Sequence, residues 1–357
     1  MTGSAAIVGA GITGRVLATT LIQRGWSTTL FESRSEMDQS GCSATAAGLL
    51  APLAELDTAD ERVAKWGLES VELWPSLLRG VETEIFFERQ GSLVVALPSE
   101  NEELIRLENR VKSYSVSAPM ERVSRERLLQ LEPELDSRFS QGIFFPLEGQ
   151  MDNRQCLAAL AKKIVASGGH IEYQSRVCCL EPHSIVVNET KQTFDWVIDC
   201  RGLDAKADLN LRGVRGELFL VETSDVHFTR PVRLMHRRHP LYVVPRPDAK
   251  FLLGATCLET ETLTPVTLRS SLEILSMAYS LHSGFSEARV LESRVQLRPA
   301  FPDNFPKVSV CPGRIRVNGM YRHGYLLSPA ISREVAEIME GGHKSSLAVE
   351  ESDETRR

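Results

Sequence analysis

Residues 4–14 read SAAIVGAGITG, an apolar run followed at once by three glycines in the spacing Gly-x-Gly-x-x-Gly. We predict that the apolar run forms a buried strand and that the glycines form the turn into a helix. Gly9 permits the tight turn, Gly11 lets a diphosphate approach the backbone, and Gly14 lets the helix pack closely on the strand. The free amide groups at the start of the helix favour a phosphate at the same point.

The residues that follow indicate what this turn binds. The helix is predicted from about Ile12 to Arg24, and a second strand over 28–32 (TTLFE) ends on Glu32. A carboxylate at that position accepts hydrogen bonds from a ribose diol, and its charge repels a 2′-phosphate, which disfavours NADP. The spacing therefore predicts a dinucleotide site, against the alternative of a glycine-rich turn without a ligand. It does not distinguish FAD from NAD.

The composition excludes several classes of protein. The chain has 357 residues, which suits two domains rather than a single core. Its net charge of -6 provides no global basic field for nucleic acid or a membrane surface, and no apolar run approaches the length of a membrane span. No secretion signal is apparent. The cysteines show no CxxC spacing, so we expect no metal site, no disulfide framework and a cytoplasmic location.

The chain alternates between two kinds of pattern. Helix-and-strand patterns occur at both ends and near 150–202, whereas the middle reads as antiparallel strands at 216–222, 241–246 and 250–255. We predict an α/β fold in which a substrate domain with an antiparallel α+β sheet is inserted into a discontinuous dinucleotide-binding domain. The predicted boundaries are 1–55, 145–215 and 300–342 for the dinucleotide-binding domain, 56–144 and 216–299 for the substrate domain, and 343–357 for a disordered tail.

Two further motifs are candidates for contact with a long cofactor. The first, CSATAAGLLAP at 42–52, combines small residues and two hydroxyls that suit close approach, with a tight apolar loop as the alternative. The second, NGMYRHGYLLSP at 318–329, is a loop that leads into a helix, with Ser328 as the expected N-cap. Arg322 and His323 in this loop are cationic candidates facing a site, with surface exposure as the alternative.

Arg298 in LRPAFPD and Tyr242 in LYVVPR indicate how an amino-acid substrate would be held. A planar guanidinium binds a carboxylate through two parallel hydrogen bonds, and a tyrosine hydroxyl adds a third donor. The alternative for a lone arginine before a proline is a structural role. A basic stretch at 230–239 reads as a solvated loop, with a binding patch as the alternative.

Together, these segments resemble the FAD-dependent glycine oxidases, which belong to the D-amino-acid oxidase group of flavoproteins and include enzymes of bacterial thiamine biosynthesis. The segments IVGAGITG with LFE, CSATAAGLLAPLAE, LYVVPR with FLLGAT, LRPAFPD and GMYRHGYLLSP occur in the family's order and approximate spacing over residues 5–340. The resemblance implies a Rossmann-like FAD-binding domain of the glutathione-reductase type. It also implies non-covalent FAD, because no cysteine stands where covalently flavinylated relatives attach the cofactor.

The resemblance also assigns roles to residues. Arg298 would grip the substrate carboxylate with help from Tyr242, and Arg322 would lie beside the flavin and the substrate. Cys257 stands where some glycine oxidases carry methionine, which leaves the size of the pocket open. The implied cofactor-binding residues are Gly9, Gly11, Ile12, Thr13, Gly14, Glu32, Ser33, Arg34, Ser43, Ala44, Thr45, Ala47, Gly48, Leu49, Val177, Cys200, Gly202, Arg298, Tyr321, Arg322, His323, Gly324, Tyr325 and Leu326.

The implied reaction is oxidation of the amine of glycine or another small amino acid to the imine by hydride transfer to flavin N5, with reoxidation by O2 to H2O2. One alternative is a different amine, or a side chain of a partner protein during maturation of a quinone cofactor, with 230–239 as a place of contact. Another is a non-catalytic FAD-binding module. The oligomeric state stays open, and we expect neither a nucleic-acid nor a membrane partner.

Overall fold

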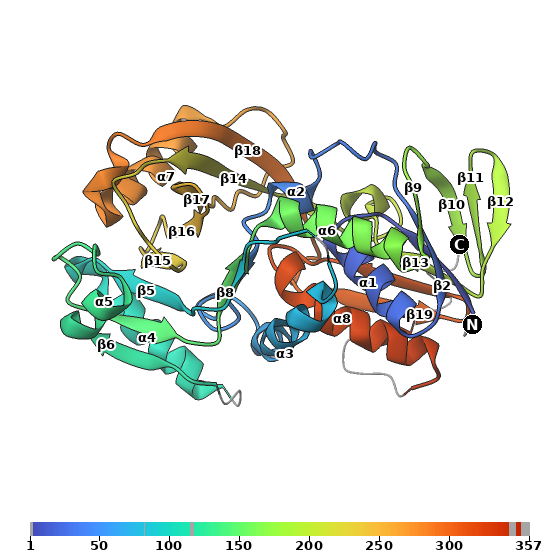
Figure 1. The fold of residues 1–357 in the computed structure, drawn as a ribbon, viewed down its shortest axis with the longest axis horizontal. Coiled ribbons are helices and arrows are strands. Elements are labelled where there is room, and N and C mark those ends of the chain that lie inside the picture. Colours follow the sequence, from blue (N-terminus) through green and yellow to red (C-terminus); the bar gives the residue numbers. More distant parts are fainter. Residues whose placement is uncertain (1–2, 82, 115–117, 343–347, 351–357) are drawn as a thin grey trace.

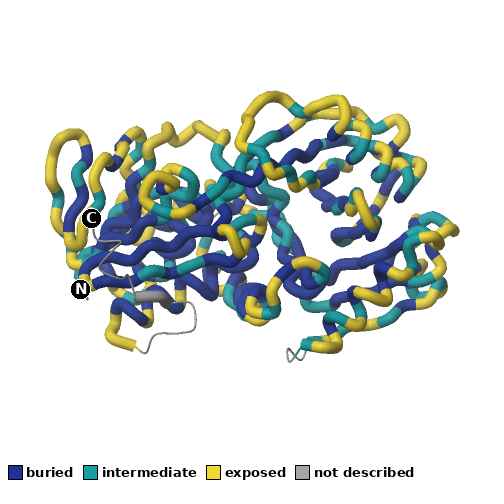
Figure 2. The backbone as a smooth tube through the Cα atoms, turned by 180° about the vertical axis from the view of Figure 1, so that it is seen from behind, coloured by how far each residue is buried: buried dark blue, intermediate teal, exposed yellow. Residues whose placement is uncertain are grey.

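The computed structural model describes residues 3–81, 83–114, 118–342 and 348–350. Two large sheets lie side by side in it, one around β1, β2 and β13 and the other around β5, β14 and β18 (Figure 1). Figure 2 shows the central strands of both sheets buried, with the exposed residues concentrated in the connecting loops and outer helices. Within the described residues, no helix combines the length and apolar character that a membrane span requires.

The first sheet has seven strands in the order β21-β19-β20-β13-β1-β2-β9. Neighbouring strands are parallel, except that β19 and β20 form an antiparallel pair. The sheet therefore brings together segments that are far apart in the sequence. Its strands are β1 (Ser4–Val8), β2 (Ser27–Phe31), β9 (His170–Glu172), β13 (Trp196–Asp199), β19 (Lys307–Cys311), β20 (Arg314–Asn318) and β21 (Ala348–Glu350).

Strand β1 shows that this sheet is covered on both faces. Ala5 and Ile7 pack in the core with the helices, while Ala6 and Val8 pack with a small three-stranded sheet, and all four are buried. The helices are α1 (Ile12–Gln23), α3 (Glu61–Leu78), α6 (Asn153–Ala166) and α8 (Gly324–Met339). The small sheet comprises β10 (Val177–Glu181), β11 (Ser184–Val187) and β12 (Thr190–Thr193).

The second sheet has eight strands in the order β18-β14-β17-β16-β15-β5-β7-β6, and only β15 and β5 are parallel neighbours. Alternate residues of β14 face opposite sides. Phe219 packs in the core that includes α7, whereas Leu218 packs with Ala47 and Leu49 on the other face. The strands are β5 (Ser92–Ala96), β6 (Glu121–Ser124), β7 (Gln141–Phe145), β14 (Arg212–Glu222), β15 (Val232–Met235), β16 (Leu241–Arg246), β17 (Lys250–Gly254) and β18 (Arg289–Ala300).

Shorter elements connect the two sheets and cover the second one. A third small sheet has the order β3-β8-β4. The antiparallel strands predicted in the middle of the chain are present as β14, β16 and β17. The remaining elements are α2 (Cys42–Thr45), β3 (Leu49–Leu50), β4 (Phe87–Glu88), α4 (Asn101–Ser113), α5 (Arg125–Leu131), β8 (Gly149–Met151), α7 (Leu268–Leu281) and 3-10 turns at Pro98–Glu100, Gly202–Ala205 and Ser283–Phe285.

Helix α8 begins at Gly324, one turn before the predicted N-cap Ser328, so the predicted start is wrong. Pro329 therefore lies inside the helix, where its missing N–H cannot bond to the carbonyl of Tyr325. The indole nitrogen of Trp74, on α3, donates to that carbonyl at 3.1 Å. A tertiary contact thus satisfies the group that the proline leaves open, and the sequence pattern gives no sign of it.

The predicted disordered tail, 343–357, is wrong for its three described residues. Ala348–Glu350 forms strand β21, which pairs in parallel with β19 at the edge of the first sheet. The rest of the predicted tail, 343–347 and 351–357, lies outside the described residues.

Candidate active site

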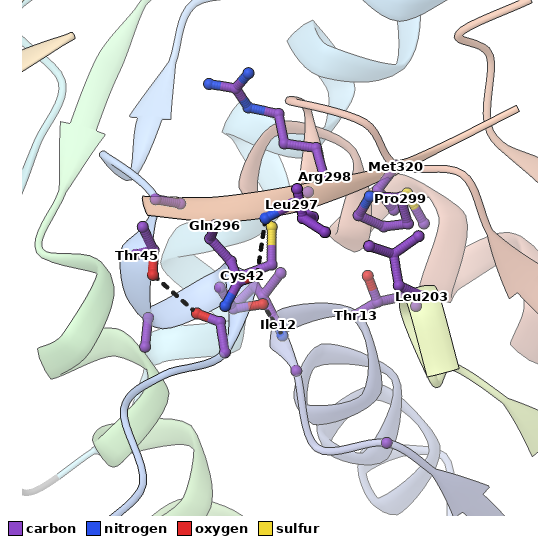
Figure 3. A pocket seen from close by; sticks show the side chains of 18 of the residues that line it. Ile12, Thr13, Cys42, Thr45, Leu203, Gln296, Leu297, Arg298, Pro299 and Met320 are labelled. Carbon is purple, nitrogen blue, oxygen red and sulfur yellow. Dashed lines mark hydrogen bonds between the residues drawn. The ribbon is translucent and has the colours of Figure 1, made fainter. Parts of the chain in front are cut away.

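A cavity of about 670 Å³ is lined by residues from both large sheets. Figure 3 shows Ile12 and Thr13, at the start of α1, beneath the strand that carries Gln296 to Pro299. The motifs that the sequence analysis singled out therefore meet in one place. All the predicted site residues line this cavity except Gly14, His323 and Leu326.

The glycine turn at one end of the cavity has the geometry that its spacing predicts. Gly9 has a φ of 104°, and a Cβ atom there would lie 2.6 Å from the carbonyl oxygen of Cys200. A Cβ atom at Gly14 would lie 2.0 Å from the carbonyl oxygen of Gly9, so Gly14 lets α1 pack on β1 rather than reaching the cavity. The amide of Ile12 donates to Ser43 Oγ at 2.9 Å, which joins the second motif to the start of α1.

Glu32 follows β2 and reaches back toward the glycine turn. Its Oε2 accepts a hydrogen bond from the Ala10 amide at 2.9 Å, and its Oε1 accepts from the Arg34 amide at 3.0 Å and the Ser33 hydroxyl at 3.2 Å. Val177, at the start of β10, lines the same end of the cavity. A carboxylate beside a tight turn and a helix start is the set of groups that binds the ribose and diphosphate of a dinucleotide.

Arg298 lies on β18 and brings a cation to the other end of the cavity. Its Nη1 donates to the carbonyl of Thr256 at 3.0 Å, and no carboxylate within the described chain pairs with it. The guanidinium lies over Gly216 of β14, where a Cβ atom would come within 2.3 Å of Nη2. Figure 3 shows the side chain extending away from the start of α1. A guanidinium with free N–H groups in a cavity is suited to a carboxylate ligand.

Tyr242, on β16, brings a second donor to this end. Its hydroxyl is buried and forms no hydrogen bond of good geometry within the described residues. The ring centre lies 5.0 Å from the guanidinium carbon of Arg233. Burial raises the pKa of Tyr242 well above its usual range, and the Glu55 carboxylate acts in the same direction, so the hydroxyl keeps its proton.

Glu55, which the sequence analysis did not single out, balances the charge of Arg322. Its Oε2 lies 2.8 Å from Nε of Arg322, and the Thr58 hydroxyl accepts from the same guanidinium. Burial raises the pKa of Glu55, but the charges of Arg322 and Arg233 outweigh burial and lower it to about 2. Among the described arginines at this end, Arg298 is therefore the one without a carboxylate partner. The available signal was a lone acid in an otherwise apolar run, AAGLLAPLAE.

The segment that carries Glu55 is anchored by a buried carboxylate. Oε1 of Glu148 accepts hydrogen bonds from the amides of Leu53 at 2.6 Å and Ala54 at 2.8 Å, and its Oε2 accepts from the Ser92 hydroxyl. Glu148 is fully buried, and burial raises its pKa to about 7. This residue fixes the backbone just before Glu55, although it does not line the cavity.

The basic stretch 230–239 requires a correction. The sequence favours a solvated loop or a contact patch, but its two least exposed arginines form ion pairs inside the fold. Arg233 is 3% exposed and binds Asp57 at 2.7 Å, and Arg230 binds the buried Glu132 at 2.9 Å. Arg233 also lines the cavity, which places part of the stretch in the site instead of on the surface.

Two residues that the resemblance assigned to cofactor binding lie in the core instead of the cavity. His323 is the N-cap residue of α8 and Leu326 packs among the helices, and both are buried. Burial lowers the pKa of His323 to about 4, and the charge of Arg322 acts in the same direction, so the ring is neutral at physiological pH. Their neighbours Tyr321, Gly324 and Tyr325 do line the cavity.

Cys257 and Tyr321 form part of the cavity wall near Arg298. The thiol sulfur lies 2.8 Å from the tyrosine hydroxyl, and Tyr321 adopts a left-handed backbone conformation with a φ of 49°. Burial, with a contribution from Cys257, raises the pKa of Tyr321 to about 12. The pair defines the volume available beside the guanidinium.

Comparison with known proteins gives a consistent result. A family model described as DAO, FAD dependent oxidoreductase, matches residues 4–338. A Rhizobium etli protein that carries the name thiamine biosynthesis oxidoreductase ThiO is 40% identical over 329 residues, which cover 92% of this chain and 94% of that protein. A glycine oxidase of Geobacillus kaustophilus is 26% identical over 362 residues, covering 94% of this chain and 92% of that protein.

Solved structures share the fold. The crystal structure of the Geobacillus kaustophilus glycine oxidase matches with a TM-score of 0.83 at 24% identity, covering 96% of each chain. The structure of an iminodiacetate oxidase from a Chelativorans species matches with a TM-score of 0.81 at 22% identity, covering 97% of this chain and 99% of the other. The predicted α/β fold class, with a Rossmann-like cofactor sheet and a second antiparallel sheet, is confirmed.

Proposed function

Because this chain belongs to the DAO family of FAD-dependent oxidoreductases, we propose that it oxidises the amine of glycine or another small amino acid to the imine, with O2 as the electron acceptor and H2O2 as product. The observation that carries this proposal is the position of Arg298. Its guanidinium lines the cavity without a carboxylate partner in the described chain, whereas the nearby Arg322 and Arg233 are each paired with one.

The cavity fits FAD at the end formed by the glycine turn. The tight turn, the amides at the start of α1 and the carboxylate of Glu32 are the groups that an adenosine diphosphate requires. We propose that Ser43 and Thr45 lie along the diphosphate and ribityl chain and that 47–49 lies against the flavin ring. Bound FAD supplies a two-electron acceptor for the hydride on the substrate's α-carbon. The cofactor is proposed to be non-covalent, so acid precipitation of the protein should leave FAD in solution.

The protein's own contribution is orientation and charge. Arg298 would bind the substrate carboxylate through two parallel N–H donors, and the buried hydroxyl of Tyr242 would add a third donor. Glu55 holds Arg322 in place, so that this cation does not compete for the carboxylate. The fixed carboxylate would present the amine and the α-carbon in one orientation, and such positioning supplies much of the acceleration in a bimolecular reaction.

Flavin reduction without oxygen tests the proposal. Glycine, sarcosine and a panel of D-amino acids are added anaerobically to the FAD-loaded protein, and bleaching of the flavin absorbance is followed. Rapid bleaching by one small amino acid supports the proposal and names the substrate. If none bleaches the flavin, the free amino-acid substrate is wrong, and an amine in a larger molecule or a protein side chain takes its place.

The Arg298→Ala variant tests the role of the guanidinium. Loss of a charged bidentate contact, worth about 1.5–3 kcal/mol, should raise KM by about 10- to 100-fold while FAD stays bound. Arg269→Ala, a highly exposed arginine on α7, is the matched control. Loss of FAD from the Arg298→Ala protein would mean that Arg298 has a structural role.

A further inference from the structure

A second cavity, of about 180 Å³, lies where the start of α6 meets the β16–β17 hairpin and β18. No step of the proposed reaction uses it. Four basic side chains line it, accompanied by two carboxylates, those of Asp152 and Asp248. Its basic side chains are Arg154, Arg246, Lys250 and Arg294.

Arg294 has unused hydrogen-bonding capacity in this cavity. It is 9% exposed, and its Nε donates to Glu292 at 2.8 Å. Within the described part of the chain, neither Nη1 nor Nη2 of Arg294 has an acceptor. Both Nη groups of Arg294 can therefore donate to an anion bound in the cavity.

Arg246 is a second buried cation in the same cavity. It is 8% exposed, and its Nη atoms donate to the Gln150 side chain and to backbone carbonyls that include those of Ala47 and Met151. Burial lowers the pKa of Arg246 to about 10. The Asp152 carboxylate opposes this change, and the charge of Arg294 adds to it. Two buried guanidinium groups that repel each other are stabilised by an anion placed between them.

Nearby carboxylates balance these cations only in part. Glu292 binds both Arg154 at 2.9 Å and Arg294 at 2.8 Å, so one carboxylate pairs with two guanidinium groups. Oδ1 of Asp152 accepts the Gln155 amide at 2.8 Å as the N-cap of α6, and Oδ2 lies 3.8 Å from Nε of Arg246. The side chain of Asp248 is 79% exposed and lies 3.5 Å from Lys250. The positive end of the α6 dipole adds to the field at this point.

We propose that this second cavity binds a phosphate-sized oxyanion, with hydrogen bonds from Arg294 and Lys250 and the added positive charge of Arg246. One water occupies about 30 Å³ of liquid, so a cavity of about 180 Å³ holds one small tetrahedral anion with a few waters, but not a nucleotide. The ligand is therefore inorganic phosphate or the phosphate group of a larger molecule whose remainder stays in solvent.

The anion would act on the wall of the main cavity. Asn153 lines the second cavity, and its Nδ2 donates to the carbonyls of Ser43 at 3.1 Å and Ala44 at 2.8 Å. Arg246 donates to the carbonyl of Ala47 on the same segment. An anion that fixes Arg246 and the start of α6 would therefore stiffen the segment that we propose lies beside the flavin.

Calorimetric titration of inorganic phosphate into the FAD-loaded protein tests the proposal. Loading with FAD fills the phosphate positions at the start of α1, and chloride keeps the ionic strength constant. We expect saturable binding that weakens at least about tenfold in Arg294→Met and about threefold in Lys250→Met, since charged hydrogen bonds are lost. Arg269→Met, on the exposed face of α7, is the control and should bind as the wild type does.

Each outcome decides the proposal. No saturable heat with either inorganic phosphate or a phosphomonoester such as glycerol 3-phosphate would overturn it. Equal affinities for wild type, Arg294→Met and Lys250→Met would also overturn it. Tighter binding of the phosphomonoester would support it and assign the phosphate to a larger molecule. If Arg294→Met fails to fold, Lys250→Met decides alone, because Lys250 pairs only with the exposed Asp248 in the described chain.

Discussion

Gly216→Ala is a test of Arg298 that leaves the arginine itself in place. The ideal Cβ atom at Gly216 lies 2.3 Å from Nη2 and 2.4 Å from Cζ of Arg298. Heavy atoms that are not bonded to each other prefer separations of about 3.5–4.0 Å, so the guanidinium must move by about 1 Å or more. The movement also strains its 3.0 Å hydrogen bond to the carbonyl of Thr256.

The expected effect is on substrate binding rather than on folding. Misplacing a substrate-binding group by about 1 Å can lower the reaction rate about 100-fold, and losing a charged hydrogen bond can lower substrate affinity about 10- to 100-fold. We therefore expect kcat/KM for the small amino-acid substrate to fall by about 10- to 100-fold, mainly through KM. The melting temperature should change little, because the clash is with the flexible end of a side chain and alanine restricts the unfolded chain more than glycine does. FAD content, measured from the visible spectrum, should be unchanged.

The strand provides its own control. Gly213 lies on β14 like Gly216, but it does not line the cavity. The three nearest atoms to its ideal Cβ all belong to side chains, those of Glu261 and Leu297 at 3.3 Å and of Leu203 at 3.4 Å. Gly213→Ala should leave KM within about twofold. The double variant Gly216→Ala/Arg298→Ala should be no worse than Arg298→Ala, because the alanine acts only through the arginine. Additive losses in the double variant, or an unchanged KM in Gly216→Ala, would refute the reasoning.

Three further predictions concern other parts of the chain. The pKa of Glu148 is raised from 4.5 to about 7, so between these pH values the native state binds a proton that the unfolded state has lost. The free energy of unfolding should therefore fall as pH rises from 4.5 to about 7. Glu148→Gln should reduce this pH dependence, measured by denaturant titration at pH 5 and pH 7. Trp74→Phe should lower the free energy of unfolding by about 1–3 kcal/mol, because it leaves the carbonyl of Tyr325 without its donor. The loss should be smaller in a Pro329→Ala background, where the amide of residue 329 can donate to that carbonyl. Cys257→Met should raise KM for D-amino acids with larger side chains more than for glycine, because methionine is longer than cysteine and narrows the cavity beside Tyr321. If the ratio of KM for these D-amino acids to KM for glycine is the same in the variant and the wild type, this wall does not select the substrate.

Local chemistry explains which parts of the fold were predictable. The strand over 4–9, the helix from Ile12 and the strand over 28–32 are present as β1, α1 and β2, because apolar periodicity and a glycine turn act over neighbouring residues. Helix α8 was misplaced for the opposite reason. Whether Pro329 can lie inside a helix depends on Trp74, which belongs to a distant segment and leaves no local signal.

The same distinction applies to the site. Glycine spacing and Glu32 pointed to the cofactor end, because the motif is contiguous. The pairing of Glu55 with Arg322 and of Asp57 with Arg233 was not foreseen, since each pair joins separate segments across the fold. A single sequence shows that such charges exist, but not which of them cancel each other. That cancellation is what leaves Arg298 as the cation available to a substrate.

The order of strands in the first sheet has a consequence for how the protein is made. β1 lies between β2 and β13, and β13 pairs with β20, so neighbours in the sheet come from 4–8, 196–199 and 314–318. At about 5–20 residues per second on the ribosome, β1 waits tens of seconds for its second partner, with an apolar edge exposed to chaperones or aggregation. The glycine turn after β1 packs against the backbone after β13, so a cofactor seated there favours the closed sheet by mass action. The supply of FAD during synthesis should therefore influence how much of the protein reaches the native state.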